Sequence, residues 1–132
     1  AEGLAKAGFD PLAPAVFIWL GVVPYLRRAA IEATLGDIAR TPGAEVVFDY
    51  SEPLENYPPE GRAGMMAMAN HAAAIGEPWL SHFDPADIAQ VLAAHGFHDQ
   101  EDLGAGDLAH RYLGAPAAAG GPGGHVIRAR RG

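Results

Sequence analysis

The chain has 132 residues, of which 49% are hydrophobic and 19% are charged, and this balance favours one globular domain over a disordered segment. Sixteen acidic residues against nine basic ones give a net charge of −7, which would repel a phosphate backbone, so nucleic acid is excluded as an expected partner. The absence of cysteine excludes disulfides and thiolate metal sites, and it favours a cytoplasmic location.

The first eight residues have the pattern of the last turns of a helix that Gly8 closes. A natural domain seldom begins inside such an element. We therefore expect residues 1–132 to form a single partial domain, the carboxyl-terminal part of a larger one.

Residues 15–26 are the most apolar run of the chain. The first half of this run shows no polar alternation, which predicts a strand covered on both faces, as in a parallel sheet between helices. Gly21 and Pro24 then end the strand and open a loop at its carboxyl end, the edge at which open α/β sheets bind small ligands. The run is too short to span a bilayer, so no membrane partner is expected.

Residues 27–40 predict an amphipathic helix, because Ile31, Leu35 and Ile38 fall on one face. Residues 45–50 predict a second strand with an apolar centre. A strand, a helix and a strand over this length form a βαβ unit, whose crossover should be right-handed.

Two further helices and a polar strand are predicted in the middle of the chain. Residues 61–75 predict a helix that directs Met65, Met66 and Met68 into a core. Asp84 is expected to cap the next helix, with a proline at its first helical position. Residues 97–103 predict a partly polar strand near an edge of the sheet.

The last segment predicts a short helix, a loop and a final strand. Asp107 is expected to cap the helix, residues 115–124 to form a flexible loop of Gly, Pro and Ala, and residues 125–130 to form the strand. The three arginines of this strand region are expected to blunt an exposed sheet edge by charge, and a binding patch is the less favoured interpretation.

The usual signatures of metal and catalytic sites are missing from this sequence. The six histidines form no His-Glu-x-x-His pattern, so no metal site is expected. No Gly-x-Ser-x-Gly elbow is present, and no Gly-x-Gly follows a predicted strand to bind a nucleotide. The glycine-rich run at residues 120–124 lacks the lysine and the following helix of a phosphate loop.

Two interpretations stay open at the ends of the predicted elements. Asp49 follows the second strand, where its carboxylate could contact a ligand or cap the loop at Ser51. Tyr57, Trp79 and Phe83 lie in irregular stretches, where they could pack as a lid on the core or form an apolar wall for a substrate.

The run Val-Phe-Ile-Trp-Leu-Gly-Val-Val-Pro-Tyr-Leu at residues 16–26 is followed by shorter runs at residues 30–35, 45–50, 76–79, 83–85, 96–97 and 102–103. In this order they resemble a family of S-adenosylmethionine (SAM)-dependent methyltransferases that are related to leucine carboxyl methyltransferase and common in actinobacteria. The resemblance covers most of the chain.

The resemblance implies an α/β fold: the carboxyl-terminal half of a Rossmann-like class I methyltransferase sheet, with flanking helices and a final antiparallel strand beside the second strand. It implies SAM as the cofactor, with the loop after the first strand beside the sulfonium. The matched positions are Trp19, Leu20, Gly21 and Val22 for the cofactor, and Tyr25, Tyr50 and Trp79 for the substrate. No catalytic residue is assigned, and Leu20 stands where leucine carboxyl methyltransferases carry a glutamate.

The function implied by the resemblance is O-methyl transfer to a small-molecule carboxylate or hydroxyl. The chain would provide part of the cofactor pocket and the substrate cover, and it would be inactive alone, since the family's glycine-rich loop belongs to the other half. The alternative is a non-catalytic interaction or assembly module derived from such an enzyme. In either case the unpaired edge of the first strand predicts self-association.

Overall fold

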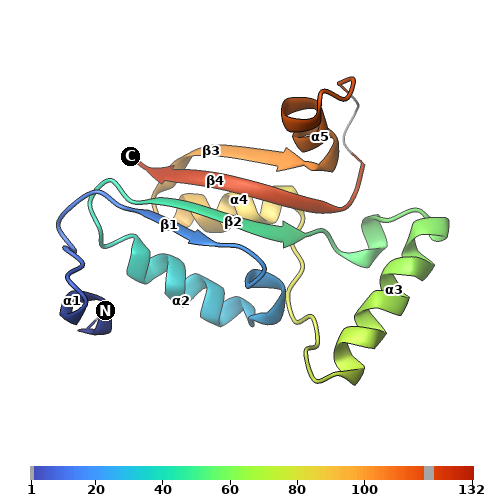
Figure 1. Cartoon of the computed structure of the whole chain (residues 1–132), viewed down its shortest axis with the longest axis horizontal. Coiled ribbons are helices and arrows are strands. Elements are labelled where there is room, and N and C mark those ends of the chain that lie inside the picture. Colours follow the sequence, from blue (N-terminus) through green and yellow to red (C-terminus); the bar gives the residue numbers. More distant parts are fainter. Residues whose placement is uncertain (1, 118–120) are drawn as a thin grey trace.

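The computed structural model describes residues 2–117 and 121–132, which form a four-stranded sheet with helices on it (Figure 1). The strands are β1 (Val16–Trp19), β2 (Glu45–Ser51), β3 (Phe97–Gly104) and β4 (Gly124–Arg131). The α-helices are α1 (Glu2–Lys6), α2 (Arg28–Ile38), α3 (Pro59–Ala74), α4 (Pro85–Ala94) and α5 (Ala105–Leu113). Two single-turn 3₁₀ helices are η1 (Val23–Tyr25) and η2 (Leu54–Asn56).

The order of the strands is β1-β2-β4-β3. β1 and β2 are parallel and α2 connects them, which confirms the predicted βαβ unit. β4 is antiparallel to both of its neighbours, which confirms the predicted final strand beside the second one. The predicted polar strand, β3, lies at the edge of the sheet, as expected from its composition.

The prediction that the arginine-rich last strand is an exposed edge is wrong. β4 lies inside the sheet, where Arg128 is 3.1 Å from the carboxylate of Asp99 in β3 and 3.8 Å from that of Glu45 in β2. A charged strand can occupy the interior of a sheet when the neighbouring strands supply opposite charges on the same face. Spacing along one strand does not reveal such cross-strand partners.

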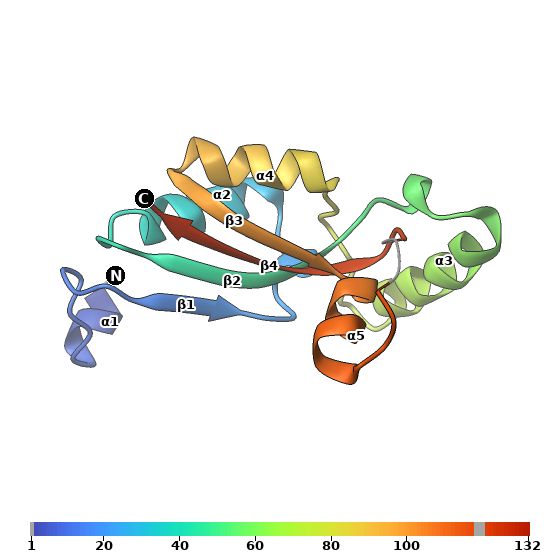
Figure 2. The same cartoon turned by 90° about the horizontal axis from the view of Figure 1, so that it is seen from above.

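The core lies between one face of the sheet and the helices α2 and α4, which Figure 2 shows above the strands. Alternate residues of β2 point into it, and Val46, Phe48 and Tyr50 are buried. The helices contribute apolar stripes to this core: Ile31, Leu35 and Ile38 from α2, as predicted, and Ile88, Val91 and Leu92 from α4.

The prediction that the first strand is covered on both faces is wrong for β1. Phe17 and Trp19 pack against the core, whereas Val16 and Ile18 point to the opposite face and Ile18 is 66% exposed. No described element covers Ile18, because α2 and α4 both lie on the other side of the sheet. An unbroken apolar run shows that the side chains on both faces of a strand are apolar. It does not show whether another element of the chain covers each face.

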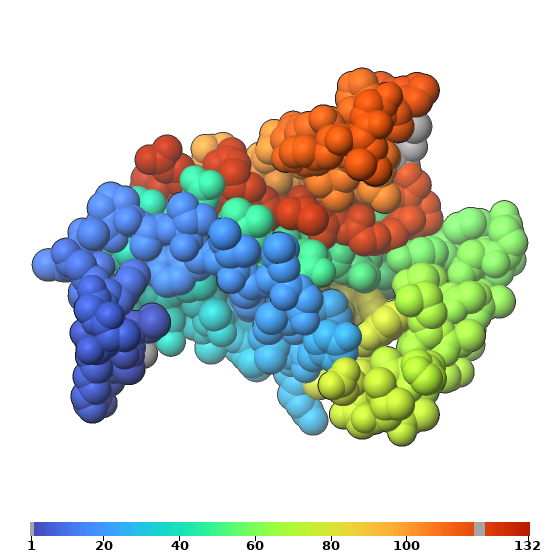
Figure 3. Space-filling model, viewed as in Figure 1, coloured from blue at the N-terminus to red at the C-terminus, as the bar shows by residue number. Residues whose placement is uncertain are grey.

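The prediction that the methionines of the helix at residues 61–75 point into a core is also wrong. α3 forms at the expected place, but it extends away from the sheet (Figure 3), buries no residue and leaves Met68 57% exposed. Its start is held by Arg62, whose guanidinium donates to the carbonyls of Leu54 and Tyr57 at 3.2 and 3.0 Å. Sequence periodicity predicts a helix and does not predict whether a core lies against it.

The predicted start of α4 is correct in place, whereas α5 begins earlier than predicted, at Ala105, so that Asp107 lies in its first turn and not before it. Asp84 is the residue before α4 and Pro85 is in its first turn, but the Asp84 carboxylate accepts from the Asn56 amide and forms no cap. Asp107 accepts the backbone N–H of Gly104 at 3.0 Å at the start of α5. Of the predicted flexible loop, residues 118–120 lie outside the described residues and Gly124 belongs to β4. No described helix is both long enough and apolar enough to cross a membrane.

Candidate functional site

The loop after β1 lies at the carboxyl edge of the parallel strand pair, because Trp19, the last residue of β1, is paired with Phe48 of β2. Gly21 is exposed and has φ of +69°, a left-handed conformation that residues with a side chain rarely adopt. A Cβ atom at Gly21 would meet no atom within 4 Å. The backbone of this loop is therefore open to a ligand, with the exposed side chains of Leu20 and Val22 on either side.

Asp49 holds the loop from the neighbouring strand. Its Oδ1 accepts the backbone N–H of Gly21 at 2.6 Å, a bond that the carboxylate charge strengthens. The sequence left two roles open for Asp49, contact with a ligand or capping of the loop at Ser51. The hydrogen bond to Gly21 is neither of these. The carboxylate fixes the loop after β1 and not the loop at Ser51, and it does so at the edge where a ligand is expected.

A second segment, residues 80–81, also holds the residues that follow this loop. The carbonyl of Pro24 accepts the backbone N–H of Leu80 at 2.7 Å, and the hydroxyl of Ser81 donates to the carbonyl of Leu26. These contacts bring Tyr25 and Trp79, which adjoin the bonded residues in sequence, to one loop cluster. Tyr25 is exposed and Trp79 is half-buried.

Tyr50, the third predicted substrate residue, is a core residue in this structure. It is 1% exposed, and its ring packs edge-to-face on Phe83, with ring centroids 6.5 Å apart. Its hydroxyl donates to the carboxylate of Asp102. The alternation of β2 directs Tyr50 toward the helices, so its burial gives no support to a substrate contact.

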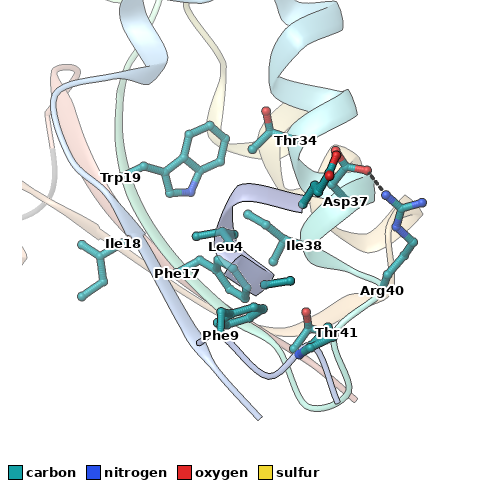
Figure 4. A pocket seen from close by; sticks show the side chains of 13 residues that line it. Leu4, Phe9, Phe17, Ile18, Trp19, Thr34, Asp37, Ile38, Arg40 and Thr41 are labelled. Carbon is teal, nitrogen blue, oxygen red and sulfur yellow. Dashed lines mark hydrogen bonds and ion pairs between the residues drawn. The ribbon is translucent and has the colours of Figure 1, made fainter. Parts of the chain in front are cut away.

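Trp19 is separated from the other predicted cofactor residues by the direction of its side chain. The indole lines a cavity of about 650 Å³ between β1, α1 and α2 (Figure 4). Leu4 and Phe17 line the same cavity, and the Trp19 ring centroid is 5.1 Å from that of Phe48. Trp19 Nε1 is buried and has no hydrogen-bond partner among the described residues. Only the backbone of Trp19 therefore belongs to the open loop.

A charged network, which sequence reasoning missed, lies in a second cavity of about 430 Å³. The ring of His125 is 2.8 Å from Asp102 Oδ1 through Nδ1 and 2.8 Å from Glu52 Oε2 through Nε2. Glu52 also accepts from the Asn56 amide at 3.0 Å and from the backbone N–H of Gly123 at 3.1 Å. Because each ring nitrogen faces a carboxylate, this arrangement favours the doubly protonated imidazolium form of His125.

The electrostatics of this network follow from its burial and its hydrogen bonds. Burial by itself would lower the pKa of His125, but the hydrogen bonds to Glu52 and Asp102 outweigh it, and the pKa is raised. Burial would raise the pKa of Glu52, but the hydrogen bonds from His125, Asn56 and Gly123 outweigh it, and the pKa is lowered. Burial and the hydrogen bond to Asp102 raise the pKa of the Tyr50 hydroxyl.

The network could not be found from sequence spacing, because its members are far apart along the chain. The register of the sheet places His125 opposite Tyr50 of β2 and opposite Gly104 of β3. The insertion of β4 between β2 and β3 thus brings the histidine between the two carboxylates. In the described part of the chain no group of three or more His, Asp or Glu has the geometry to hold a metal ion.

Comparison with known proteins gives matches of sequence and of fold. The sequence model of the leucine carboxyl methyltransferase family matches residues 1–39. A protein of Mycolicibacterium smegmatis, provisionally named an S-adenosyl-L-methionine-dependent methyltransferase, is 29% identical over 125 residues, which are 87% of this chain and 39% of that protein. The resemblance stated from the sequence is confirmed by these matches.

Two solved structures share the fold. One is a Nostoc punctiforme protein provisionally named an O-methyltransferase, with a TM-score of 0.55 and 14% identity over 88% of this chain and 31% of its own. The other is a Bordetella parapertussis protein described as a possible exported protein, with a TM-score of 0.56 and 14% identity over 88% of this chain and 38% of its own. The likeness confirms the predicted fold class, a Rossmann-like α/β sheet with a final antiparallel strand. The chain spans about two-fifths of the length of the curated relative.

Proposed function

We propose that this chain forms part of a cytoplasmic SAM-dependent methyltransferase that transfers a methyl group to the oxygen of a small-molecule carboxylate or hydroxyl. The observation that carries the proposal is the open loop after β1, where Gly21 exposes its backbone at the carboxyl edge of the sheet. The match to the leucine carboxyl methyltransferase family over residues 1–39 includes this loop and supports the assignment.

The residues of this edge fit SAM. The cofactor carries a positive charge on its sulfur, and Asp49 places a carboxylate beside the loop at 2.6 Å from the Gly21 nitrogen. Leu20 and Val22 add exposed apolar surface, so that residues 19–22 would form one wall of the cofactor site. When bound, SAM supplies an electrophilic methyl group on a sulfonium.

The other residues of the site act by position. Tyr25 and Trp79, which the Pro24–Leu80 contact holds in one cluster, would cover the acceptor and exclude water. We assign no general base, because both ring nitrogens of His125 are already engaged by carboxylates. A carboxylate acceptor needs none, since its oxygen is already deprotonated at neutral pH.

The experiment that tests this function begins with the size of the native polypeptide, measured in source cells with an antibody raised against this chain. Binding of SAM and of S-adenosylhomocysteine (SAH) to that native polypeptide is then measured by calorimetry. We expect a polypeptide at least twice as long as this chain, since the curated relative is longer by that factor, and we expect it to bind both ligands. A native polypeptide that binds neither would refute the proposal.

The same proposal predicts that residues 1–132 alone transfer no methyl group, because no glycine-rich loop follows a strand in this sequence. Methyl transfer by the isolated chain, measured with radiolabelled SAM, would contradict this dependence.

A second candidate function is an assembly module, and the exposed edge of β1 favours it. The carbonyl of Ala15 accepts the backbone N–H of Glu45 in β2. In a parallel pair every second residue of a strand bonds to the same neighbour. The backbone groups of Val16 and Ile18 therefore point away from β2, toward the open edge of the sheet. Their side chains are exposed as well. An unpaired, apolar edge of this kind pairs with a further strand, which we propose is β1 of a second copy.

The substitution Ile18→Lys is expected to convert a dimer of the chain into a monomer, because a lysine on an edge strand opposes edge-to-edge pairing. Sedimentation equilibrium measures the change. Leu113→Lys is the matched control, since Leu113 is an exposed apolar residue of similar size on α5, away from β1, and it should leave the dimer intact. A wild-type chain that is monomeric at all concentrations tested would remove this second candidate.

A further inference from the structure

The carboxylate of Asp49 carries a charge that no described cation balances. Asp49 takes part in none of the ion pairs among the described residues, and its described contact is the backbone N–H of Gly21. The two other carboxylates near the carboxyl ends of β2 and β3, those of Glu52 and Asp102, share the proton and charge of His125. Asp49 is thus a negative charge fixed in place beside the open loop.

We propose that Asp49 makes the site discriminate between SAM and its product SAH by charge. The inference rests on the proposed function, in which the Gly21 loop lies beside the cofactor. In the transfer, a lone pair of the acceptor oxygen forms the new C–O bond, and a hydroxyl acceptor gives its proton to solvent. The S–CH₃ bond breaks, and both of its electrons stay on sulfur. The sulfur therefore changes from a positively charged sulfonium to a neutral thioether.

This change of charge is what Asp49 distinguishes. Apart from the methyl group that is lost, the rest of the cofactor is chemically unchanged by the transfer, so the charge on sulfur is the main difference that a site can recognise. A fixed carboxylate attracts only the charged form, by an amount that falls with distance and with solvent screening. Since Asp49 is half-buried, water screens it only in part. The site then binds the reactant more tightly than the product and favours release of the product.

The test replaces the charge and keeps the hydrogen-bond acceptor. In Asp49→Asn the side-chain carbonyl oxygen still accepts the Gly21 N–H, while the negative charge is lost. In the native polypeptide we expect this variant to weaken SAM binding about fivefold and to change SAH binding less than about twofold. Calorimetric titration with SAM and with SAH measures both dissociation constants without any need for turnover.

Asp10→Asn is the matched control. Asp10 lies before the amino end of β1, and its carboxylate also accepts a backbone N–H in an exposed turn, that of Leu12 at 2.9 Å. This variant should leave both dissociation constants unchanged. If Asp49→Asn binds both ligands with the wild-type ratio, the charge inference is overturned while the proposed function stands. If the wild-type native polypeptide binds neither ligand, both are overturned.

Discussion

The substitution His125→Ala is expected to lower the free energy of unfolding by about 3 kcal/mol, the cost of leaving a buried charge without its partner. His125 is the positive member of the network, and its side chain is only 11% exposed. Without it, Glu52 and Asp102 face each other across the cavity with no proton between them. The loss is measured as a shift of the urea unfolding curve of the chain.

His98→Ala is the matched control, because His98 lies exposed on β3 and makes no described hydrogen bond. It should change stability by less than about 0.5 kcal/mol. A second variant tests the cause of the loss. Adding Asp102→Asn to His125→Ala removes one of the two unpaired carboxylates, so the double variant should be more stable than His125→Ala alone. Equal losses for His125→Ala and His98→Ala would contradict the role of the network.

The stability of the chain is expected to be greatest between about pH 4.5 and pH 6.5, the ordinary pKa values of Glu52 and His125. The pKa of His125 is raised on folding, so its contribution is fully present below pH 6.5 and is lost as pH rises through the folded-state pKa. The pKa of Glu52 is lowered on folding, so its contribution is present above pH 4.5 and is lost as pH falls through the folded-state pKa. The free energy of unfolding should therefore decline on both sides of this range.

Urea unfolding at a series of pH values measures this dependence. The decline above pH 6.5 should be steeper in the wild-type chain than in His125→Ala, which has lost the titrating group. His98→Ala keeps the network and should follow the wild-type curve. A wild-type curve that runs parallel to that of His125→Ala over this range would show that His125 does not control the decline.

The network of His125, Glu52 and Asp102 joins three strands of the sheet around the second cavity. Glu52 accepts from the backbone of Gly123 just before β4, while Asp102 belongs to β3. One imidazolium therefore ties the ends of β2 and β3 to the start of β4. Tyr50 lies stacked on the His125 ring, with centroids 4.8 Å apart, and extends the same contacts into the core. Loss of the network should loosen this end of the sheet first.

Local patterns of the sequence determined the elements. The apolar stripes of α2 and α4 and the apolar centre of β2 each follow from residues close together in the chain. The loop at Gly21 also follows from local residues. A glycine after an apolar strand indicates a turn with a positive φ, which a residue with a side chain rarely adopts. These predictions hold because propensity and periodicity act over a few residues.

Only the tertiary structure decided which faces are covered and which charges meet. β1 and α3 carry apolar residues that predict burial, yet Ile18 and Met68 are exposed, because no described element lies against them. Asp49 contacts Gly21, 28 residues away, and His125 contacts Glu52, 73 residues away. Such contacts depend on the strand order β1-β2-β4-β3, which arises from packing of the whole sheet and which no local pattern encodes.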